Sequence, residues 1–156
     1  MRESFRTRAF RWAMNWWPCY RGAGARVTFI AGDWSEVRVR LALTLRTRNY
    51  VGSIFGGSLY AAVDPFFMIM LIKRLGPDFV VWDKAAAIRF KRPGRSTLTA
   101  AFRITEEELQ EIRRILETEP KVDRTYTVQL VDAQGVVHAE VDKVVHVRRK
   151  DFRPRG

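Results

Sequence analysis

The chain has 156 residues, of which 47% are hydrophobic and 29% are charged. This length and composition are typical of one packed globular domain, and they argue against a disordered chain or two independent domains. The formal net charge of +11 favours an anionic partner, namely nucleic acid, an acidic membrane surface or a phosphorylated small molecule, unless the basic surface only aids solubility.

Cysteine and histidine are scarce. Cys19 is the single cysteine, so no disulfide can form within the chain, which fits a reducing compartment. With only His138 and His146 as histidines, we expect no metal site. Because Arg8 and Arg11 interrupt the apolar positions near the N-terminus, we expect no secretory signal and a cytoplasmic location, with an Arg-rich transit peptide as the alternative.

The first predicted element is an amphipathic N-terminal helix within residues 1–20. Basic and aromatic residues follow one another with helical spacing from Ser4 to Trp16, and Pro18 comes directly after. Such a stripe is typical of a helix that associates with a membrane surface or nucleic acid, but it would equally pack across a sheet or a subunit interface.

Two strands are predicted next. Ser35–Leu45 alternates apolar and polar residues with period two, which is the clearest strand pattern in the chain. Arg26–Ile30 predicts a shorter strand before it, across a turn near Gly32 and Asp33. Neighbouring strands joined by a short turn usually pair, so we expect these two to be partners.

Residues 56–75 predict a central helix. The segment from Ser58 to Leu75 is apolar nearly all round, which indicates a helix that is buried on several sides. Its length approaches that of a membrane span, but Asp64 and Pro65 in its middle argue against one. Pro65 has no N–H to donate, so we expect a kink beside Asp64.

The remaining elements complete an antiparallel α+β fold. Four strands are expected at 80–91, 97–104, 125–131 and 136–147, the last two joined by a hairpin loop at 132–135. Thr105 and Glu108 resemble a capping box that opens a polar helix through about Leu116. This order predicts a single domain, residues 1–156, in which a curved antiparallel sheet wraps around one long central helix and an extra helix precedes it.

A candidate site lies at the start of the central helix. Glycines let a ligand approach the backbone closely, and the N–H groups of a helix's first turn are free to bind it. Asp64 is the only charged residue between Arg48 and Lys73. Burial of an unpaired carboxylate is costly, so Asp64 is either a functional group or a structural one paired with an arginine or with backbone donors.

The spacing of this segment resembles that of a known family. The motif Asn-x-x-Gly-x-x-His-Gly-Gly with a downstream Asp is found in hotdog-fold acyl-CoA thioesterases, particularly the phenylacetate-pathway type, and here it corresponds to Asn49, Gly52, Phe55, Gly56, Gly57 and Asp64. Phe55 departs from the motif because it replaces the histidine. The resemblance implies a hotdog fold, a homodimer that shares one continuous sheet, acyl-CoA sites at the dimer interface, and further pairing into tetramers in many relatives.

The resemblance also implies roles for individual residues. The backbone N–H of Gly57 would polarise a thioester carbonyl, Asp64 would attack the carbonyl carbon or activate water, and Asn49 would orient water or substrate. The expected substrate-binding residues are Gly56, Phe55, Asp83, Lys84, Arg92 and Arg95. The coenzyme A thioester is the substrate, and no cofactor is expected.

Each of these roles has a structural alternative. Asn49 would otherwise close its own turn, Asp83 and Lys84 would form an interface salt bridge, and the arginines would lie on a solvated turn. The leading hypothesis is an acyl-CoA thioesterase. The alternatives are a non-catalytic acyl-CoA or fatty-acyl binding protein and a basic protein that binds a membrane or nucleic acid.

Overall fold

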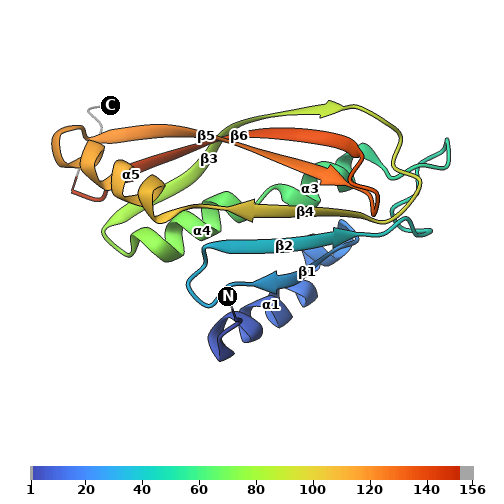
Figure 1. Ribbon diagram of the computed structural model, residues 1–156, viewed down its shortest axis with the longest axis horizontal. Coiled ribbons are helices and arrows are strands. Elements are labelled where there is room, and N and C mark those ends of the chain that lie inside the picture. Colours follow the sequence, from blue (N-terminus) through green and yellow to red (C-terminus); the bar gives the residue numbers. More distant parts are fainter. Residues whose placement is uncertain (1, 152–156) are drawn as a thin grey trace.

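The structure is a computed structural model that describes residues 2–151, so residues 1 and 152–156 of the predicted domain lie outside the described part. One six-stranded antiparallel sheet has the strand order β1-β2-β4-β5-β6-β3 (Figure 1). The strands are β1 (Ala25–Ile30), β2 (Glu36–Leu41), β3 (Phe79–Phe90), β4 (Leu98–Arg103), β5 (Lys121–Val131) and β6 (Val137–Arg149). The helices are α1 (Phe5–Trp16), α2 (Pro18–Gly22), α3 (Gly56–Val63), α4 (Phe66–Leu75) and α5 (Glu106–Thr118).

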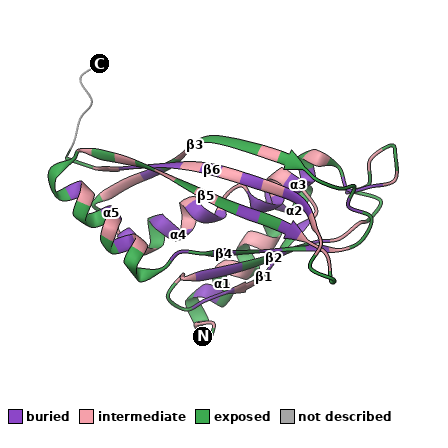
Figure 2. Cartoon of the chain, turned by 45° about the horizontal axis from the view of Figure 1, so that its top comes forward, coloured by how far each residue is buried: buried purple, intermediate pink, exposed green. Residues whose placement is uncertain are grey.

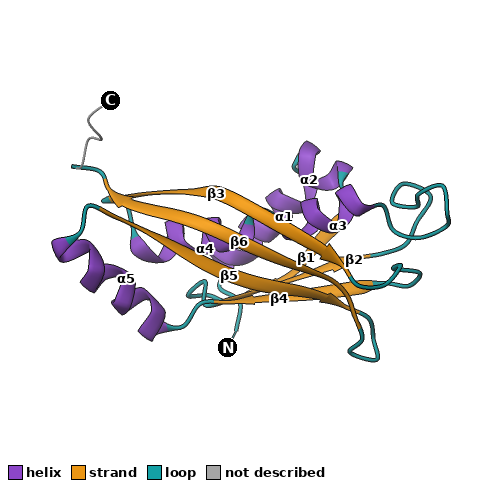
Figure 3. Ribbon diagram, turned by 90° about the horizontal axis from the view of Figure 1, so that it is seen from above, coloured by secondary structure: helices purple, strands orange, loops and turns teal. Residues whose placement is uncertain are grey.

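The sheet curves around the central helices α3 and α4, which run along one of its faces (Figure 3). The core lies between them and is built by the inward-facing residues of the strands and by apolar residues of α4 such as Phe66, Met70 and Leu71, all fully buried. The sheet thus explains the apolar residues on the covered side of α4, whereas Ile72 on the other side is 41% exposed. This is the predicted hotdog fold, and the α+β prediction is confirmed.

The central helix is interrupted where the sequence predicted a kink. α3 ends at Val63, and α4 begins at Phe66 after Asp64 and Pro65. Proline cannot donate to the carbonyl four residues earlier, which breaks the regular helical ladder. At this break the Ala62 carbonyl accepts a hydrogen bond from the buried Tyr20 hydroxyl at 3.1 Å. The break is therefore stabilised by a side chain from α2.

The predicted N-terminal helix consists of two helices. α1 ends at Trp16, and Pro18 opens the short α2. α1 lies along the edge strand β1, where the Asn15 side chain accepts from the Val27 N–H at 2.7 Å and donates to its carbonyl at 3.0 Å. Glu3 accepts from the Ile30 N–H at 3.0 Å. These side chains satisfy backbone groups that an edge strand would otherwise leave open.

Two predicted boundaries differ from the structure. β2 ends at Leu41, although the alternation continues to Leu45, which is 92% exposed. The chain turns away because the buried Thr47 hydroxyl accepts from the Thr44 N–H at 2.8 Å and donates to the Ala42 carbonyl at 2.7 Å. β5 begins at Lys121, four residues before the predicted start, since its first residues pair with the C-terminal part of the long strand β6.

Helix α5 starts as predicted, with a different role for Glu108. The Thr105 side chain accepts from the Glu108 N–H at 3.2 Å and caps the helix. The Glu108 carboxylate accepts from Arg124 at 2.7 Å and from the Tyr126 hydroxyl at 2.8 Å. The residue expected to complete a capping box therefore fixes α5 to β5.

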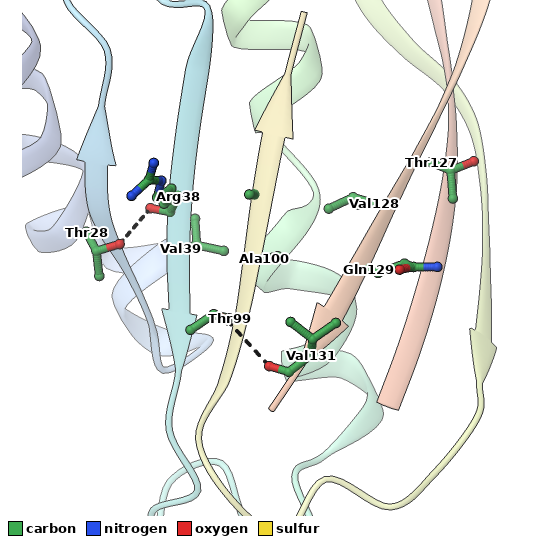
Figure 4. Close-up of a pocket in the computed structure, with 10 residues that line it drawn as sticks. Thr28, Arg38, Val39, Thr99, Ala100, Thr127, Val128, Gln129 and Val131 are labelled. Carbon is green, nitrogen blue, oxygen red and sulfur yellow. Dashed lines mark hydrogen bonds between the residues drawn. The ribbon is translucent and has the colours of Figure 1, made fainter. Parts of the chain in front are cut away.

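The sheet opens between β4 and β5, where Thr99 and Val131 form the one residue pair of the ladder among the described residues. The opening is a cavity of about 660 Å³ bordered by both strands and by parts of β1 and β2 (Figure 4). None of the residues predicted for the site lines this cavity.

Within residues 2–151, every helix is too short or too polar to cross a membrane.

At the opposite edge from β1, the central and C-terminal parts of β3 are largely exposed (Figure 2). The exposed residues include Ala85, Ala86 and Ala87, which are small and uncharged. An edge strand leaves backbone N–H and C=O groups free to pair with another strand, and the alanine run of β3 carries no charged or bulky side chain, although Lys84 and Arg89 lie on either side of it. The β3 edge is therefore open to pairing.

Candidate functional site

The N-terminus of α3 faces a cavity of about 360 Å³ that we call the α3 cavity. It is lined by Asn49, Ser53, Ile54, Gly56, Leu59, Phe90, Lys91, Arg92, Pro93 and Gly94. The N–H groups in the first turn of a helix have no partner within that helix, and they carry its positive dipole end. Three predicted residues, Asn49, Gly56 and Arg92, therefore share one cavity beside backbone donors.

Two aromatic rings crowd the glycines at the start of α3. A Cβ on Gly57 would collide with the Phe55 ring, and a Cβ on Gly56 would lie 3.0 Å from the Phe90 ring. Phe55 is 57% exposed and precedes the first helical residue. The side chain that replaces the motif's histidine therefore lies at the helix entrance as an apolar ring, and glycine at position 57 is what allows it to approach.

Asn49 closes its own loop. Its Oδ1 accepts from the N–H groups of Val51 at 3.1 Å and Ser53 at 3.0 Å, and its Nδ2 donates to Ser53 Oγ at 3.0 Å. Gly52 completes the turn with a φ of 81°, in the left-handed region where glycine is favoured. The Asn49 amide is thus committed to shaping the wall of the α3 cavity, as in the alternative considered for it.

A second group of residues lies at the other end of α3, and we call it the Asp64 cluster: Tyr60, Asp64, Asp83 and Lys143. The Lys143 ammonium on β6 contacts Asp64 Oδ1 at 2.6 Å, Asp83 Oδ2 at 3.0 Å and the Tyr60 hydroxyl at 3.2 Å. The Lys143 side chain is completely buried, whereas that of Asp64 is 43% exposed. An ammonium has three N–H groups, and here each of them has an acceptor.

The electrostatics of the Asp64 cluster follow from this geometry. Burial alone would lower the pKa of Lys143, but its hydrogen bonds to Asp64 and Asp83 outweigh burial and raise the pKa, so the ammonium stays charged. Burial raises the pKa of Asp83, and the Asp64 carboxylate adds to that rise while Lys143 opposes it. Burial likewise raises the pKa of Tyr60, with Asp64 contributing.

Sequence reasoning missed Lys143 and Tyr60. The inward positions of β6 are Ala139, Val141, Lys143, Val145 and Val147, so a lysine interrupts an otherwise apolar series. A buried lysine needs an anionic partner, and Asp64 is the carboxylate that the sequence places inside the apolar central helix. Tyr60 precedes Asp64 by four residues on the helix and shares its face. Both signals were therefore present in the sequence.

Lys84 and Arg95 line neither the α3 cavity nor the Asp64 cluster, whereas Arg92 lines the α3 cavity. Lys84 donates to Asp123 at 2.5 Å, and Asp123 also contacts His146 Nδ1 at 2.5 Å, so Lys84 does not pair with Asp83. Arg92 and Arg95 lie in the connection from β3 to β4, which crosses the sheet because those strands are not neighbours. Both side chains are exposed.

The arrangement provides the parts of an acid–base site in two places. The Asp64 cluster carries two carboxylates and one ammonium, so it keeps one net negative charge when both carboxylates are ionised. The α3 cavity carries backbone donors and a basic rim from Lys91 and Arg92. Within residues 2–151, no three His, Cys, Asp or Glu side chains are grouped so that they would hold a metal ion.

Comparison with solved structures gives matches along most of the chain. A Pseudomonas aeruginosa protein of unknown function, named a probable thioesterase, aligns with a TM-score of 0.81 and 21% identity over 96% of this chain and 99% of its own. A Haemophilus influenzae thioesterase aligns with a TM-score of 0.68 and 11% identity, covering 99% of this chain and 98% of that one. The Escherichia coli PaaI protein of the phenylacetic acid degradation operon has a TM-score of 0.59 and 21% identity, with coverages of 90% and 95%.

These similarities establish the fold, and at such low identity they establish the fold alone. No curated protein matches the chain. The model of a domain of unknown function, DUF4442, matches residues 6–147, a range that contains the whole of the central helix and all strands except the last two residues of β6. The chain therefore belongs to the DUF4442 family and has the hotdog fold.

Proposed function

We propose that this protein hydrolyses a thioester that links an acyl group to coenzyme A or to a related carrier. The observation that carries the proposal is Asp64, a solvent-accessible carboxylate held at the break of the hotdog central helix by the buried Lys143. The thioesterase names of the Pseudomonas aeruginosa and Haemophilus influenzae neighbours support the same reaction class.

In the proposed reaction, Asp64 acts as general base or as nucleophile. As a base it takes a proton from water, whose oxygen bonds to the carbonyl carbon; the N–H of Gly57 stabilises the resulting oxyanion. The oxyanion then collapses, the carbon–sulfur bond breaks, and the thiolate leaves and is protonated. As a nucleophile, Asp64 would instead form an acyl anhydride that water hydrolyses. Lys143 keeps the Asp64 carboxylate in place in both routes.

One chain does not bring the two catalytic parts together. Gly57 and Asp64 are seven residues apart, which corresponds to about 10 Å along a helix axis. A carbonyl carbon and its oxygen need both groups within about 3 Å. We therefore propose a homodimer in which Asp64 of one protomer works with the α3 N-terminus of the other. The open β3 edge, with its three exposed alanines, is the proposed site of pairing, and two dimers would form any tetramer.

The basic residues near the α3 cavity are the proposed phosphate-binding groups. Lys91 and Arg92 line this cavity, and Arg95 lies exposed three residues further along the same connection. Arginine engages phosphate oxygens through its planar guanidinium, which supports coenzyme A over an uncharged thiol as the carrier. Lys84 is a weaker candidate for binding phosphate, because its ammonium already forms an ion pair with Asp123.

Phe55 favours one alternative function, a protein that binds acyl-CoA without hydrolysing it. The ring supplies no hydrogen bond where the motif's histidine would supply one, and together with Phe90 it gives the entrance of α3 an apolar lining. Such an apolar surface would bind an acyl chain whether or not the protein hydrolyses the thioester.

Thiol release from a panel of acyl-CoA esters, from acetyl to long-chain and phenylacetyl, tests the proposal. We expect release by the natural protein and a loss of at least about 100-fold in kcat for Asp64→Asn, since the amide is neither base nor nucleophile. Asp78→Asn, which changes an exposed aspartate outside the site, is the matched control and should keep full activity. Tight binding of the esters without release would establish the alternative, and unchanged release by Asp64→Asn would refute the role of Asp64.

A further inference from the structure

Helix α1 has a second apolar face that points to solvent. Phe10 and Met14 pack against the core. On the other side, the exposed fractions of Phe5, Trp12 and Trp16 are 80%, 67% and 55%. At 3.6 residues per turn these three side chains fall within about 40° of one another around the helix. They form one continuous stripe, extended by Trp17 just beyond the helix, and we call these four residues the aromatic stripe.

The aromatic stripe is bordered by arginines. On the same helical projection, Arg6 and Arg8 flank it on either side, and both are exposed. Residues 2–26 contain six arginines and one acidic residue, Glu3. Glu3 is itself paired with Arg11 at 2.9 Å, so it does not offset the charges of Arg6 and Arg8 beside the stripe. A strongly cationic surface with exposed indole rings requires an anionic partner that can also bury apolar groups.

We propose that α1 docks this protein on an anionic lipid bilayer, with the helix lying in the plane of the membrane surface. Tryptophan and phenylalanine side chains insert at the level of the lipid headgroups, while flanking arginines bind the phosphates of acidic lipids. The aromatic stripe and its arginines match both requirements on one helix face. This inference does not depend on the proposed hydrolysis.

Two other occupants fit less well. If a second copy covered the stripe through a two-fold axis, the same arginines of both copies would face each other, which is repulsive. A DNA duplex offers phosphates but no apolar layer for four exposed aromatic rings. A bilayer supplies both the negative charge and the apolar layer.

The position of α1 leaves the stripe accessible in the proposed dimer. α1 packs on β1, and β3 lies at the opposite end of the strand order (Figure 1). Pairing of two protomers along β3 therefore uses the edge of the sheet that is remote from α1. Each protomer of such a dimer would present its own stripe.

Flotation of the full-length protein with phospholipid vesicles tests this proposal. We expect binding to vesicles of phosphatidylcholine mixed with phosphatidylserine, weaker binding as salt increases, and little binding to phosphatidylcholine alone. The double variant Phe5→Ala with Trp12→Ala should lower the vesicle partition coefficient by at least about tenfold. Arg6→Gln with Arg8→Gln should lower it by about 30-fold. Thiol release should be unaffected by either change.

The matched control is Arg113→Gln with Arg114→Gln, which removes the same charge from exposed positions of α5 and should change the partition by less than about twofold. Thermal melts establish whether each variant is folded. If the aromatic double variant does not fold, the arginine double variant tests the proposal by itself. The proposal is overturned by absent or equal binding to the two kinds of vesicle, or by stripe variants that bind like the natural protein. Tighter binding to a single-stranded DNA oligonucleotide than to vesicles would also overturn the proposal. So would stripe variants that lower the mass measured by sedimentation without affecting vesicle binding, because the stripe would then be an interface between copies of the chain.

Discussion

Lys143 determines the chemistry of the candidate site. Completely buried, it holds Asp64 and Asp83 together on one ammonium, and it lies on β6 while they lie beside α3 and on β3. Removal of Lys143 would leave both carboxylates without their counter-charge, which usually costs far more stability than an ion pair contributes. Asp83 is the least well satisfied of the three, because within the described residues its buried Oδ1 has no hydrogen-bond partner.

The raised pKa of Asp83 predicts a stability change with a definite sign. The folded state binds the Asp83 proton more tightly than the unfolded chain does, so the free energy of unfolding falls as the pH rises from the unfolded pKa through the folded pKa of Asp83. Asp83→Asn should therefore melt at a higher temperature than the natural protein at pH 8. The difference should shrink as the pH falls through the folded pKa and disappear below the unfolded carboxyl value of about 4.

Melting curves of both proteins between pH 4 and pH 8 measure this effect. Asp78→Asn again serves as the control, because it removes one carboxylate from an exposed position outside the Asp64 cluster. A lower melting temperature of Asp83→Asn at pH 8 would mean that Asp83 stabilises the fold through Lys143 by more than its own burial costs.

Spacing in the sequence located single residues of the site without their partners. The interval from the Gly-Gly pair to Asp64, and the position of Asp83 on the strand after the helix, followed from a local pattern and a family resemblance. Lys143 lies 79 positions after Asp64, and its contact with Asp64 depends on how β6 is placed in the sheet. Local patterns carry no information on such a contact, although the alternation of β6 marked Lys143 as an inward-facing charge.

At the level of elements, the break between α3 and α4 gives the site its shape. It ends α3 at Asp64 and lets that carboxylate leave the apolar environment that surrounds α4. Pro65 made this break predictable. Its stabilisation was not predictable, because the Tyr20 hydroxyl that binds the Ala62 carbonyl comes from a helix 42 positions away.

Tyr20→Phe should lower the free energy of unfolding by about 1–2 kcal/mol. The change removes one buried hydrogen bond and leaves the Ala62 carbonyl without its donor, while the ring keeps its packing against Phe66. Urea denaturation measures the loss. Tyr50→Phe, at a fully exposed loop position, is the control and should have no effect. Equal stability of Tyr20→Phe and the natural protein would show that the break does not need this hydrogen bond.

Element types were predictable to a greater extent than their ends. Alternation identified β2, and continuous apolarity identified the central helix, because burial on one side or on all sides leaves those patterns in the sequence. The ends of the elements, and the details of their caps, depended on individual side-chain hydrogen bonds. The Thr47 hydroxyl binds the Ala42 carbonyl and ends β2 before the alternating pattern ends. The Glu108 carboxylate binds Arg124 and so does not complete the predicted capping box of α5.

For the whole molecule, the two edges of the sheet have different properties. α1 and the side chains of Asn15 and Glu3 cover the β1 edge, whereas β3 exposes a run of alanines at the other edge. In the proposed mechanism, the distance of about 10 Å from Gly57 to Asp64 along α3 would leave each protomer with two incomplete halves of a site. A dimer through β3 would complete both sites and leave the aromatic stripe free.

Mixing two inactive variants tests this shared site most directly. Asp64→Asn removes the carboxylate, and Gly57→Pro removes the N–H; a first-turn position tolerates proline because that N–H has no helical partner. A Cβ at this position would meet the ring of Phe55, an exposed side chain. In a randomly assembled mixture of equal amounts, half of the dimers are mixed, and each mixed dimer contains one intact site. We therefore expect thiol release at about a quarter of the natural rate from the co-refolded mixture and almost none from either variant alone. A mixture no more active than the sum of its separate variants would contradict the shared site.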